Sequence, residues 1–528
     1  MAVSRVATVR NRSAPAADHR CMSAIVSVRS AGLHGITALP ITVEAHLGNG
    51  LPAFHVVGLT DRAIQEARER VRVALAAVGR SLPARRITVN LAPAEMPKEG
   101  TAYDLPVALA VLEADGADLG LAGIAAVGEL GLDATLRPVI GVLPMARALR
   151  AAGIGVLIVP AANAAEARLV AGLRVVGLPD LGSCLCWLQG DRTGDGYPGC
   201  ADPVAADDGG AGDLAHIRGQ PMARRAVEIA AAGGHNLLML GPPGSGKTLL
   251  ARCTAGLLPD LSGDEAIDVA SLYSLRGAFR DRPLGSLRPP FRAPHHSISR
   301  AGLVGGGTGV ASPGELSLAH HGVLFLDELC EFSRAHLEAL RQPLEERRVT
   351  IGRSRGAVTL PTDFMLVAAA NPCPCGFLND PRRRCRCDDH AVDLYRGRLS
   401  GPLRDRIDIH VEVPRPELAS LTDPAPEEAS AAVRARVAAA RSLQRQRNAG
   451  LLNAALPSAD VVERCLPSRP ALHVLVRAGN ARALSGRGFH RVLRVARTIA
   501  DLDGAATVAD DHVLEALAQR HDSEPVAS

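Results

Sequence analysis

The chain has 528 residues, of which 47% are hydrophobic and 22% are charged, a balance typical of globular rather than disordered proteins. A single hydrophobic core stops growing near about 250 to 300 residues, so this length predicts about three domains. The formal net charge is only +4, so any nucleic-acid surface has to be local, and the aromatic content of 2% argues against a base-stacking platform.

Charged side chains recur along the chain, so we expect no membrane-spanning helix. Residues 1–21 carry arginines but lack the apolar segment of a secretory signal. The first segment with the pattern of a folded domain begins at Met22, so we interpret residues 1–21 as a disordered extension or a misassigned start. These features predict a cytoplasmic protein, in which the 11 cysteines are thiols or metal ligands rather than disulfides.

The first predicted domain covers residues 22–190 and is of the α/β class. Apolar runs at 87–90 and 156–160 indicate strands, and segments 63–78 and 144–152 have the apolar spacing of helices.

The second predicted domain, residues 214–414, is also α/β and contains a nucleotide-binding motif. An apolar strand at 237–240 precedes the sequence GPPGSGKT, and a helical pattern follows at 249–258. In this setting backbone N–H groups wrap phosphates at a helix N-terminus, a lysine reaches the β- and γ-phosphates, and a threonine ligates Mg²⁺. We therefore predict ATP and Mg²⁺ binding by Gly241, Pro242, Pro243, Gly244, Ser245, Gly246, Lys247 and Thr248.

Two further strands of this domain end in polar side chains. The apolar run 323–326 ends in Asp327 and Glu328, which suit an Mg²⁺ ligand and a general base, respectively. The run 364–370 ends in Asn371, whose amide could contact the γ-phosphate or the attacking water, although a turn residue before a proline is an equal alternative.

Breaks in composition separate the predicted domains. Residues 191–213 hold six glycines and six aspartates and predict a linker. A second linker is expected at 415–428. Residues 429–519 have a helical pattern throughout and predict a C-terminal helical domain, followed by a tail at 520–528.

Two close cysteine pairs follow Asn371. Four thiolates within one loop suggest a tetrahedral Zn²⁺ site, although the C-x-C spacing is less typical than C-x-x-C, and free thiols remain the alternative. The predicted zinc ligands are Cys373, Cys375, Cys385 and Cys387.

Several longer motifs carry a resemblance to a known family. The segment 217–220, the P-loop, Asp327-Glu328 and Asn371, in this order, resemble an AAA+ ATPase. FRAPHHS at 291–297, PGELSLAHHG at 313–322 and SGRGFH at 485–490 are similar to the magnesium-chelatase-like ATPases, and within them to the YifB/ComM branch.

The resemblance implies two further site residues and an assembly. The segment GPLRDRID at 401–408 is similar to the one that supplies an arginine finger, with Arg406 the better match and Arg404 the reserve. Arg487 matches the second sensor arginine at the start of a lid helix. A finger acts on the γ-phosphate of a neighbouring subunit, so a ring, expected to be a hexamer, is implied.

The resemblance also bears on the first domain, which is similar to the ribosomal-S5-like fold of the Lon protease domain. Ala102 and Met145 stand where that protease has its nucleophilic serine and its lysine base, so proteolysis is disfavoured. Lys98, one of only two lysines in the chain, is interpreted as a solvated loop residue or part of a binding surface.

DNA is the predicted partner of the ring. The YifB/ComM resemblance implies an ATP-driven motor on branched DNA that serves recombination during transformation, with a helicase or branch-migration type of activity. A basic segment at 347–360 predicts a hairpin with Arg353 and Arg355 near its tip, and 382–386 is a second basic segment. The rival hypothesis is a motor subunit that remodels a protein, as in magnesium chelatase, but the chain lacks the D-x-S-x-S adhesion motif for it.

Overall fold

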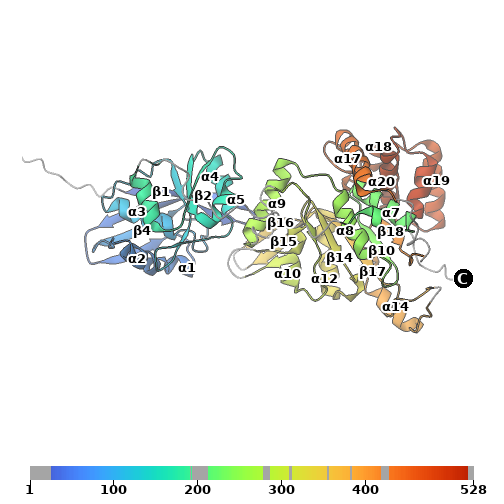
Figure 1. Ribbon diagram of the computed structural model, residues 1–528, viewed down its shortest axis with the longest axis horizontal. Helices are drawn as coiled ribbons and strands as arrows, with labels where there is room; N and C mark the ends of the chain where they lie inside the picture. The colour runs from blue at the N-terminus through green and yellow to red at the C-terminus, as the bar shows by residue number, and fades with distance from the viewer. Residues whose placement is uncertain are drawn as a thin grey trace, which may run out of the picture.

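The computed structural model describes residues 25–190, 192, 212–277, 286–307, 312–353, 356–380, 383–417 and 427–520. A first sheet with its helices, a second sheet and a group of C-terminal helices follow one another along the long axis of the molecule (Figure 1). None of the described helices is both long and apolar enough to cross a membrane. The extension predicted for residues 1–21 lies outside the described residues.

The first sheet has seven strands in the order β3-β4-β2-β1-β5-β8-β9. β1, β2 and β4 pair antiparallel, and the remaining neighbours pair parallel. The predicted strands at 87–90 and 156–160 are confirmed as β4 and β8. The bounds are β1 (Val26–His34), β2 (Thr37–Gly48), β3 (Ala53–Val57), β4 (Arg86–Ala92), β5 (Ile124–Ala126), β8 (Val156–Pro160) and β9 (Arg174–Leu178), with the small pair β6 (Glu129–Leu130) and β7 (Leu136–Arg137).

Helices α2, α3 and α4 cover this sheet. α3 is buried along almost its whole length because it packs against β1, β2 and α2. The helical spacing of 63–78 is confirmed, and the segment forms two helices that meet at Glu66, which ends one and begins the next. The bounds are α1 (Arg62–Gln65), α2 (Ala67–Ala77), α3 (Asp104–Ala114), α4 (Val142–Ala151), α5 (Ala164–Ala167) and α6 (Leu181–Gln189).

The second sheet has five strands in the order β11-β14-β17-β10-β18, and all four pairings are parallel. Both β14 and β17 are buried at every residue, which explains their continuous apolar sequence. This arrangement fits an AAA+-like α/β core. The bounds are β10 (Leu237–Leu240), β11 (Phe291–Arg292), β14 (Val323–Leu326), β17 (Met365–Ala370) and β18 (Ile409–Glu412).

Because its strands are parallel, the second sheet has two chemically different edges. One set of loops follows the carboxyl ends of the strands, at what we call the carboxyl edge. Another set precedes the amino ends of the strands, at the amino edge. The surrounding helices are α7 (Pro221–Gly233), α8 (Lys247–Leu257), α9 (Gly263–Arg276), α10 (Arg300–Val304), α11 (Glu315–Leu318), α12 (Arg334–Ala339), α13 (Arg341–Glu346), α14 (Asp389–Gly397) and α15 (Gly401–Arg404). Two short hairpins accompany them, β12 (Gly305–Gly306) with β13 (Ser312–Pro313) and β15 (Arg348–Arg353) with β16 (Gly356–Pro361).

The C-terminal helices share one hydrophobic cluster with α7 and β10, so they are packed firmly on the second sheet's layer. Ser485 begins α20 by accepting a hydrogen bond from the Gly488 N–H. The bounds are α17 (Ser430–Arg447), α18 (Val461–Cys465), α19 (Arg469–Ala481), α20 (Gly486–Leu502) and α21 (Asp510–Ala518).

Helix α9, which belongs to the second sheet's layer, makes polar contacts with α4 and α5 beside the first sheet. The Ser274 hydroxyl donates to the Glu166 carboxylate at 2.6 Å, and the Gly141 N–H donates to the Ser274 carbonyl at 3.1 Å. Arg147 pairs with Asp268 at 2.9 Å. Burial raises the pKa of Glu166, and the hydrogen bond from the Ser274 hydroxyl offsets part of the cost of removing this carboxyl group from water.

Candidate functional site

The P-loop runs from β10 to the first turn of α8. Gly244 and Gly246 have φ angles of +77° and +91°, a left-handed conformation that favours glycine. At Gly241 a Cβ atom would lie 2.2 Å from the Val413 carbonyl oxygen, so no larger residue fits there. The Ser245 hydroxyl is buried without a hydrogen-bond partner among the described residues. The loop therefore forms a cradle of the shape that a phosphate chain requires.

Lys247 points back into this cradle. Its ammonium group donates to the carbonyl oxygens of Gly241 and Pro242, at 2.7 and 2.9 Å, and lies 3.4 Å from Asn371 Oδ1. Burial lowers its pKa to about 8, against the opposing effect of the neighbouring carboxylates Asp327 and Glu328. A buried ammonium held only by neutral oxygens is poised to bind an anion.

The predicted magnesium ligands meet beside the lysine. The Thr248 hydroxyl, in the first turn of α8, donates at 2.9 Å to Oδ2 of Asp327, the residue after β14. A hydroxyl and a carboxylate at this spacing are hard oxygen donors of the kind that Mg²⁺ takes next to phosphates, so these residues fit that ion.

Glu328 lies next to this pair on a strained backbone. Its φ of +50° is unusual for a residue with a side chain, and its N–H donates to Asp327 Oδ1 at 3.0 Å. Its carboxylate is half exposed and lies 3.7 Å from His296 Nδ1. His296 belongs to the motif at 291–297, but its place beside Glu328 could not be predicted from the sequence.

Gln220 is a second residue whose role sequence reasoning missed. Its side-chain amide donates to the carbonyl oxygens of Ser245 and Pro414, at 2.6 and 3.0 Å, and so ties the P-loop to the end of β18. The segment 217–220 had pointed to the family, but the contact with Pro414 depends on the tertiary fold.

The two predicted arginines lie at the other edge of the sheet. Asn236, directly before β10, donates through its side chain to the Arg406 carbonyl oxygen at 3.1 Å, whereas the P-loop follows β10. Arg406 is largely buried and pairs with Glu345 at 2.7 Å. Arg487 is exposed and lies 3.3 Å from the same Glu345 oxygen. The structure thus brings Arg406 and Arg487 together, away from Lys247 of the same chain.

The four predicted zinc ligands converge in one cluster. Cys373 Sγ lies 3.4 Å from Cys375 Sγ and 3.7 Å from Cys385 Sγ, and the four sulfur atoms all lie within 4.8 Å of one another. A tetrahedron with Zn–S bonds of about 2.3 Å has S···S edges of about 3.8 Å. The cluster, which Cys387 completes, therefore has the donors and the spacing of a tetrahedral thiolate site.

The predicted basic hairpin is present as β15 and β16, which pair antiparallel up to Arg353 and Gly356. Arg355 and the side chain of Arg353 lie outside the described residues, and so does Arg382 in the second basic segment. In that segment, Arg383 stacks over the Phe377 ring at 4.1 Å.

The interpretation of Lys98 as a solvated or surface residue is wrong. Its side chain is fully buried and donates to the Pro93 carbonyl oxygen, and burial lowers its pKa. Ala102 and Met145 are buried in one hydrophobic cluster, so the two positions compared with a protease dyad hold no hydroxyl and no amine.

A P-loop, an acidic pair and a polar strand end on a five-stranded parallel sheet define a P-loop ATPase of the AAA+ type. The family profiles of magnesium chelatase subunit ChlI match residues 43–163 and 213–421, and the profile of its C-terminal region matches 427–520.

Several full-length relatives agree with these profiles. The chain is 43% identical to competence protein ComM of Haemophilus influenzae, over 92% of this chain and 95% of the relative. It is 42% identical to the YifB protein of Escherichia coli with the same coverage, and 44% identical to a Mycobacterium tuberculosis protein over 93% and 97%. The chain belongs to the magnesium-chelatase-like YifB/ComM family, and this membership implies ATPase activity.

Proposed function

We propose that the chain hydrolyses ATP at a site shared between neighbouring subunits of a ring, expected to be a hexamer. The observation that carries the proposal is the division of the site between two edges of one parallel sheet. Lys247, Thr248, Asp327, Glu328 and Asn371 lie at the carboxyl edge. The two arginines lie at the amino edge, so they are available to another subunit rather than to their own P-loop.

Each residue has a proposed part in phosphoryl transfer. Lys247 holds the β- and γ-phosphates, and Asn371, which already contacts its ammonium group, orients the γ-phosphate or the water. Glu328 accepts the proton of the attacking water. Thr248 and Asp327 would hold Mg²⁺, which neutralises phosphate charge when bound. Arg406 and Arg487 of the next subunit stabilise the charge that develops on the transferring group.

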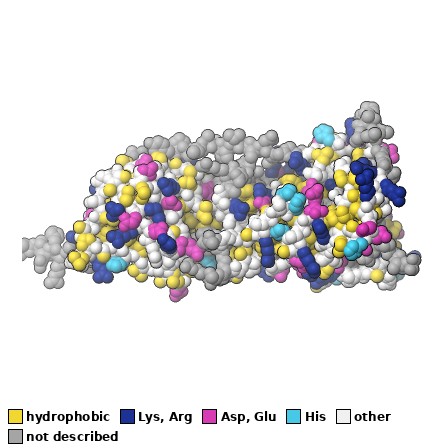
Figure 2. Space-filling model, turned by 90° about the horizontal axis from the view of Figure 1, so that it is seen from below, with side chains coloured by type: hydrophobic (Ala, Val, Ile, Leu, Met, Phe, Trp, Pro, Cys, Tyr) yellow, Lys and Arg dark blue, Asp and Glu magenta, His cyan; other side chains and the backbone are white. Residues whose placement is uncertain are grey.

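We propose that the ring acts on DNA as a motor of the helicase or branch-migration type. The name competence protein of the Haemophilus influenzae relative supports a role in handling incoming DNA. Basic and acidic side chains are interspersed on the face seen in Figure 2, in keeping with the net charge of +4. Phosphate contacts are therefore assigned to the local basic hairpin β15–β16, where Arg353 and Arg355 would repeat around a central channel.

A bound Zn²⁺ is proposed for the cysteine cluster. The cysteine loop begins directly after Asn371, at the end of β17. Four thiolates on a metal would fix this loop and so keep the Asn371 side chain beside Lys247.

One assay tests the motor proposal. ATP turnover is measured without DNA and with single-stranded, duplex and four-way-junction DNA at constant salt. We expect DNA, and the junction most strongly, to stimulate turnover. Equal rates with and without every DNA would contradict the motor while leaving the ATPase intact.

A further inference from the structure

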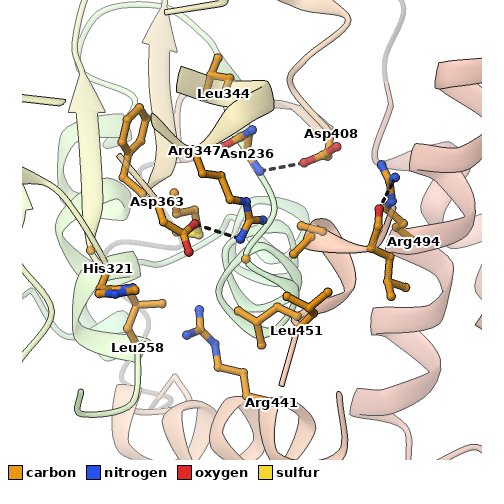
Figure 3. A pocket seen from close by; sticks show the side chains of 18 of the residues that line it. Asn236, Leu258, His321, Leu344, Arg347, Asp363, Asp408, Arg441, Leu451 and Arg494 are labelled. Atoms are coloured by element: carbon orange, nitrogen blue, oxygen red, sulfur yellow. Dashed lines mark hydrogen bonds and ion pairs between the residues drawn. The ribbon is translucent and has the colours of Figure 1, made fainter. Parts of the chain in front are cut away.

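A cavity of about 610 Å³ lies between the amino edge of the second sheet and the C-terminal helices (Figure 3). This volume falls within the range of about 300 to 1,000 Å³ that small-molecule sites occupy. Guanidinium groups dominate its lining, from Arg347, Arg406, Arg441, Arg445, Arg487, Arg491 and Arg494. The carboxylates of the lining belong to Asp260, Glu265, Glu345, Asp363 and Asp408. The lining therefore has an excess of positive charge.

Most of these charges are compensated within the protein. Arg347 pairs with Asp363 at 3.0 Å, Arg491 with Asp408 at 3.3 Å, and Arg445 with Glu265 at 3.3 Å. The two arginines proposed for catalysis share Glu345. One carboxylate of the lining, Asp260, is itself bound to Arg434 at 2.6 Å.

Arg441 and Arg494 remain without a carboxylate partner among the residues that the structure describes. Arg441 extends from α17 into the cavity in Figure 3, and only its Nε bonds to protein, to the Ala231 carbonyl oxygen at 2.8 Å. Arg494 donates to the Leu456 carbonyl oxygen at 2.5 Å, while its Nε is buried without a partner. Burial lowers the pKa of Arg441 to about 10 and also lowers that of Arg494.

Arg441 and Arg494 are both partly exposed, and neither forms an ion pair with a carboxylate of the described residues, so an anion that enters the cavity can pair with both without displacing a carboxylate. Guanidinium groups bind phosphate through two parallel hydrogen bonds, which makes phosphate the anion that suits them best. Apolar side chains also line the cavity, namely Leu258, Leu344, Leu451 and Phe364. A phosphate with an attached ring system would contact both the guanidinium groups and these apolar side chains.

We propose that this cavity binds a nucleoside polyphosphate from solution, with Arg441 and Arg494 as its phosphate ligands. The site is separate from the P-loop, because the two lie at opposite edges of the sheet. The proposal does not depend on the roles given to the catalytic arginines. The phosphates of a neighbouring subunit's ATP have the same chemistry, and the experiment below distinguishes that source.

The test uses full-length Lys247→Ala protein, in which the P-loop lacks its ammonium group. Inorganic triphosphate and, separately, ADP are titrated by isothermal calorimetry. We expect about one bound molecule per chain and at least tenfold weaker binding after Arg441→Gln or Arg494→Gln. The matched control is Arg477→Gln, which removes the same charge from an exposed position of α19 outside the cavity and should change nothing.

Thermal unfolding guards against misfolded variants. Because each Gln variant removes a cation that forms no ion pair within the described residues, its melting temperature without ligand should not fall. If either Gln variant does unfold, Arg441→Lys keeps the charge without the planar fork and should still weaken triphosphate binding. The proposal is overturned by the absence of saturable binding, by equal weakening in Arg477→Gln, or by binding that requires added subunits with an intact P-loop and ATP.

Discussion

Mixing two inactive variants tests whether one ATPase site is built from two subunits. Lys247→Ala removes the ammonium group from the carboxyl edge of the sheet, and Arg406→Ala removes a guanidinium group from the amino edge. An arginine finger contributes about 10³- to 10⁵-fold to turnover, so each variant alone should be almost inactive.

The expected recovery follows from the positions of the two groups. An interface in a mixed ring is intact only when an Arg406→Ala subunit provides the pocket and a Lys247→Ala subunit provides the arginine. With equal random mixing, about one half times one half, or about one quarter, of the interfaces are intact, so about one quarter of the wild-type rate should return. The rate should vary with the mixing fraction f as f(1 − f), with its maximum at equal amounts.

Phosphate release is measured as the fraction is varied, and native mass spectrometry verifies that mixed rings have formed. The control is a mixture of Lys247→Ala with Glu328→Gln, whose lesions lie in one pocket, so no interface is intact and no rate should return. An absence of recovery in verified mixed rings, or equal recovery in the control mixture, would refute the shared site.

Four further predictions concern other parts of the site. Glu328→Gln should retain ATP binding and lose about 10²- to 10⁴-fold in turnover, because only activation of the water is removed, and an unchanged single-turnover rate would contradict that role. Metal analysis of tag-free protein should find about one zinc per chain for the four-cysteine cluster, and none under reducing conditions would leave the thiols without metal. The double variant Arg353→Ala, Arg355→Ala should weaken DNA binding while basal ATPase activity persists. The slope of log affinity against log salt concentration should become shallower by about 0.7 to 0.9 for each lost phosphate contact. Unchanged affinity and slope would show that the hairpin does not contact DNA. Gln220→Ala should lower the free energy of unfolding, by about 1 to 3 kcal/mol for each of the two carbonyl groups it leaves unpaired, and an unchanged denaturation midpoint would show that water replaces the amide.

The carboxyl edge of the second sheet could be predicted from sequence because its motifs are short and sit on strong strands. Each polar group follows a buried apolar run, and parallel strands bring such groups to one edge. Lys247 meets Asn371, and Thr248 meets Asp327, at the edge of the sheet where this rule places them.

Other features depend on contacts that no local pattern encodes. Lysine usually lies at the protein surface, yet Lys98 is buried and its hydrogen-bond partner is a backbone carbonyl group. Glu345 joins Arg406 and Arg487 from a helix about 60 and 140 residues earlier in the chain, so neither spacing nor periodicity indicates it. Among the described residues Arg441 has no carboxylate partner, and this likewise depends on how α17 packs on the core.

The two unlike edges of the second sheet also restrict the symmetry of any working assembly. If the arginines of one edge serve the pocket of the other, the contact is heterologous, and a two-fold dimer that joins like surfaces cannot complete a site. A heterologous contact repeats until rotation closes it, and without closure it extends as a filament. A substitution that changes only the angle between subunits would therefore leave every interface chemically intact, yet it would convert a closed assembly into an open fibre.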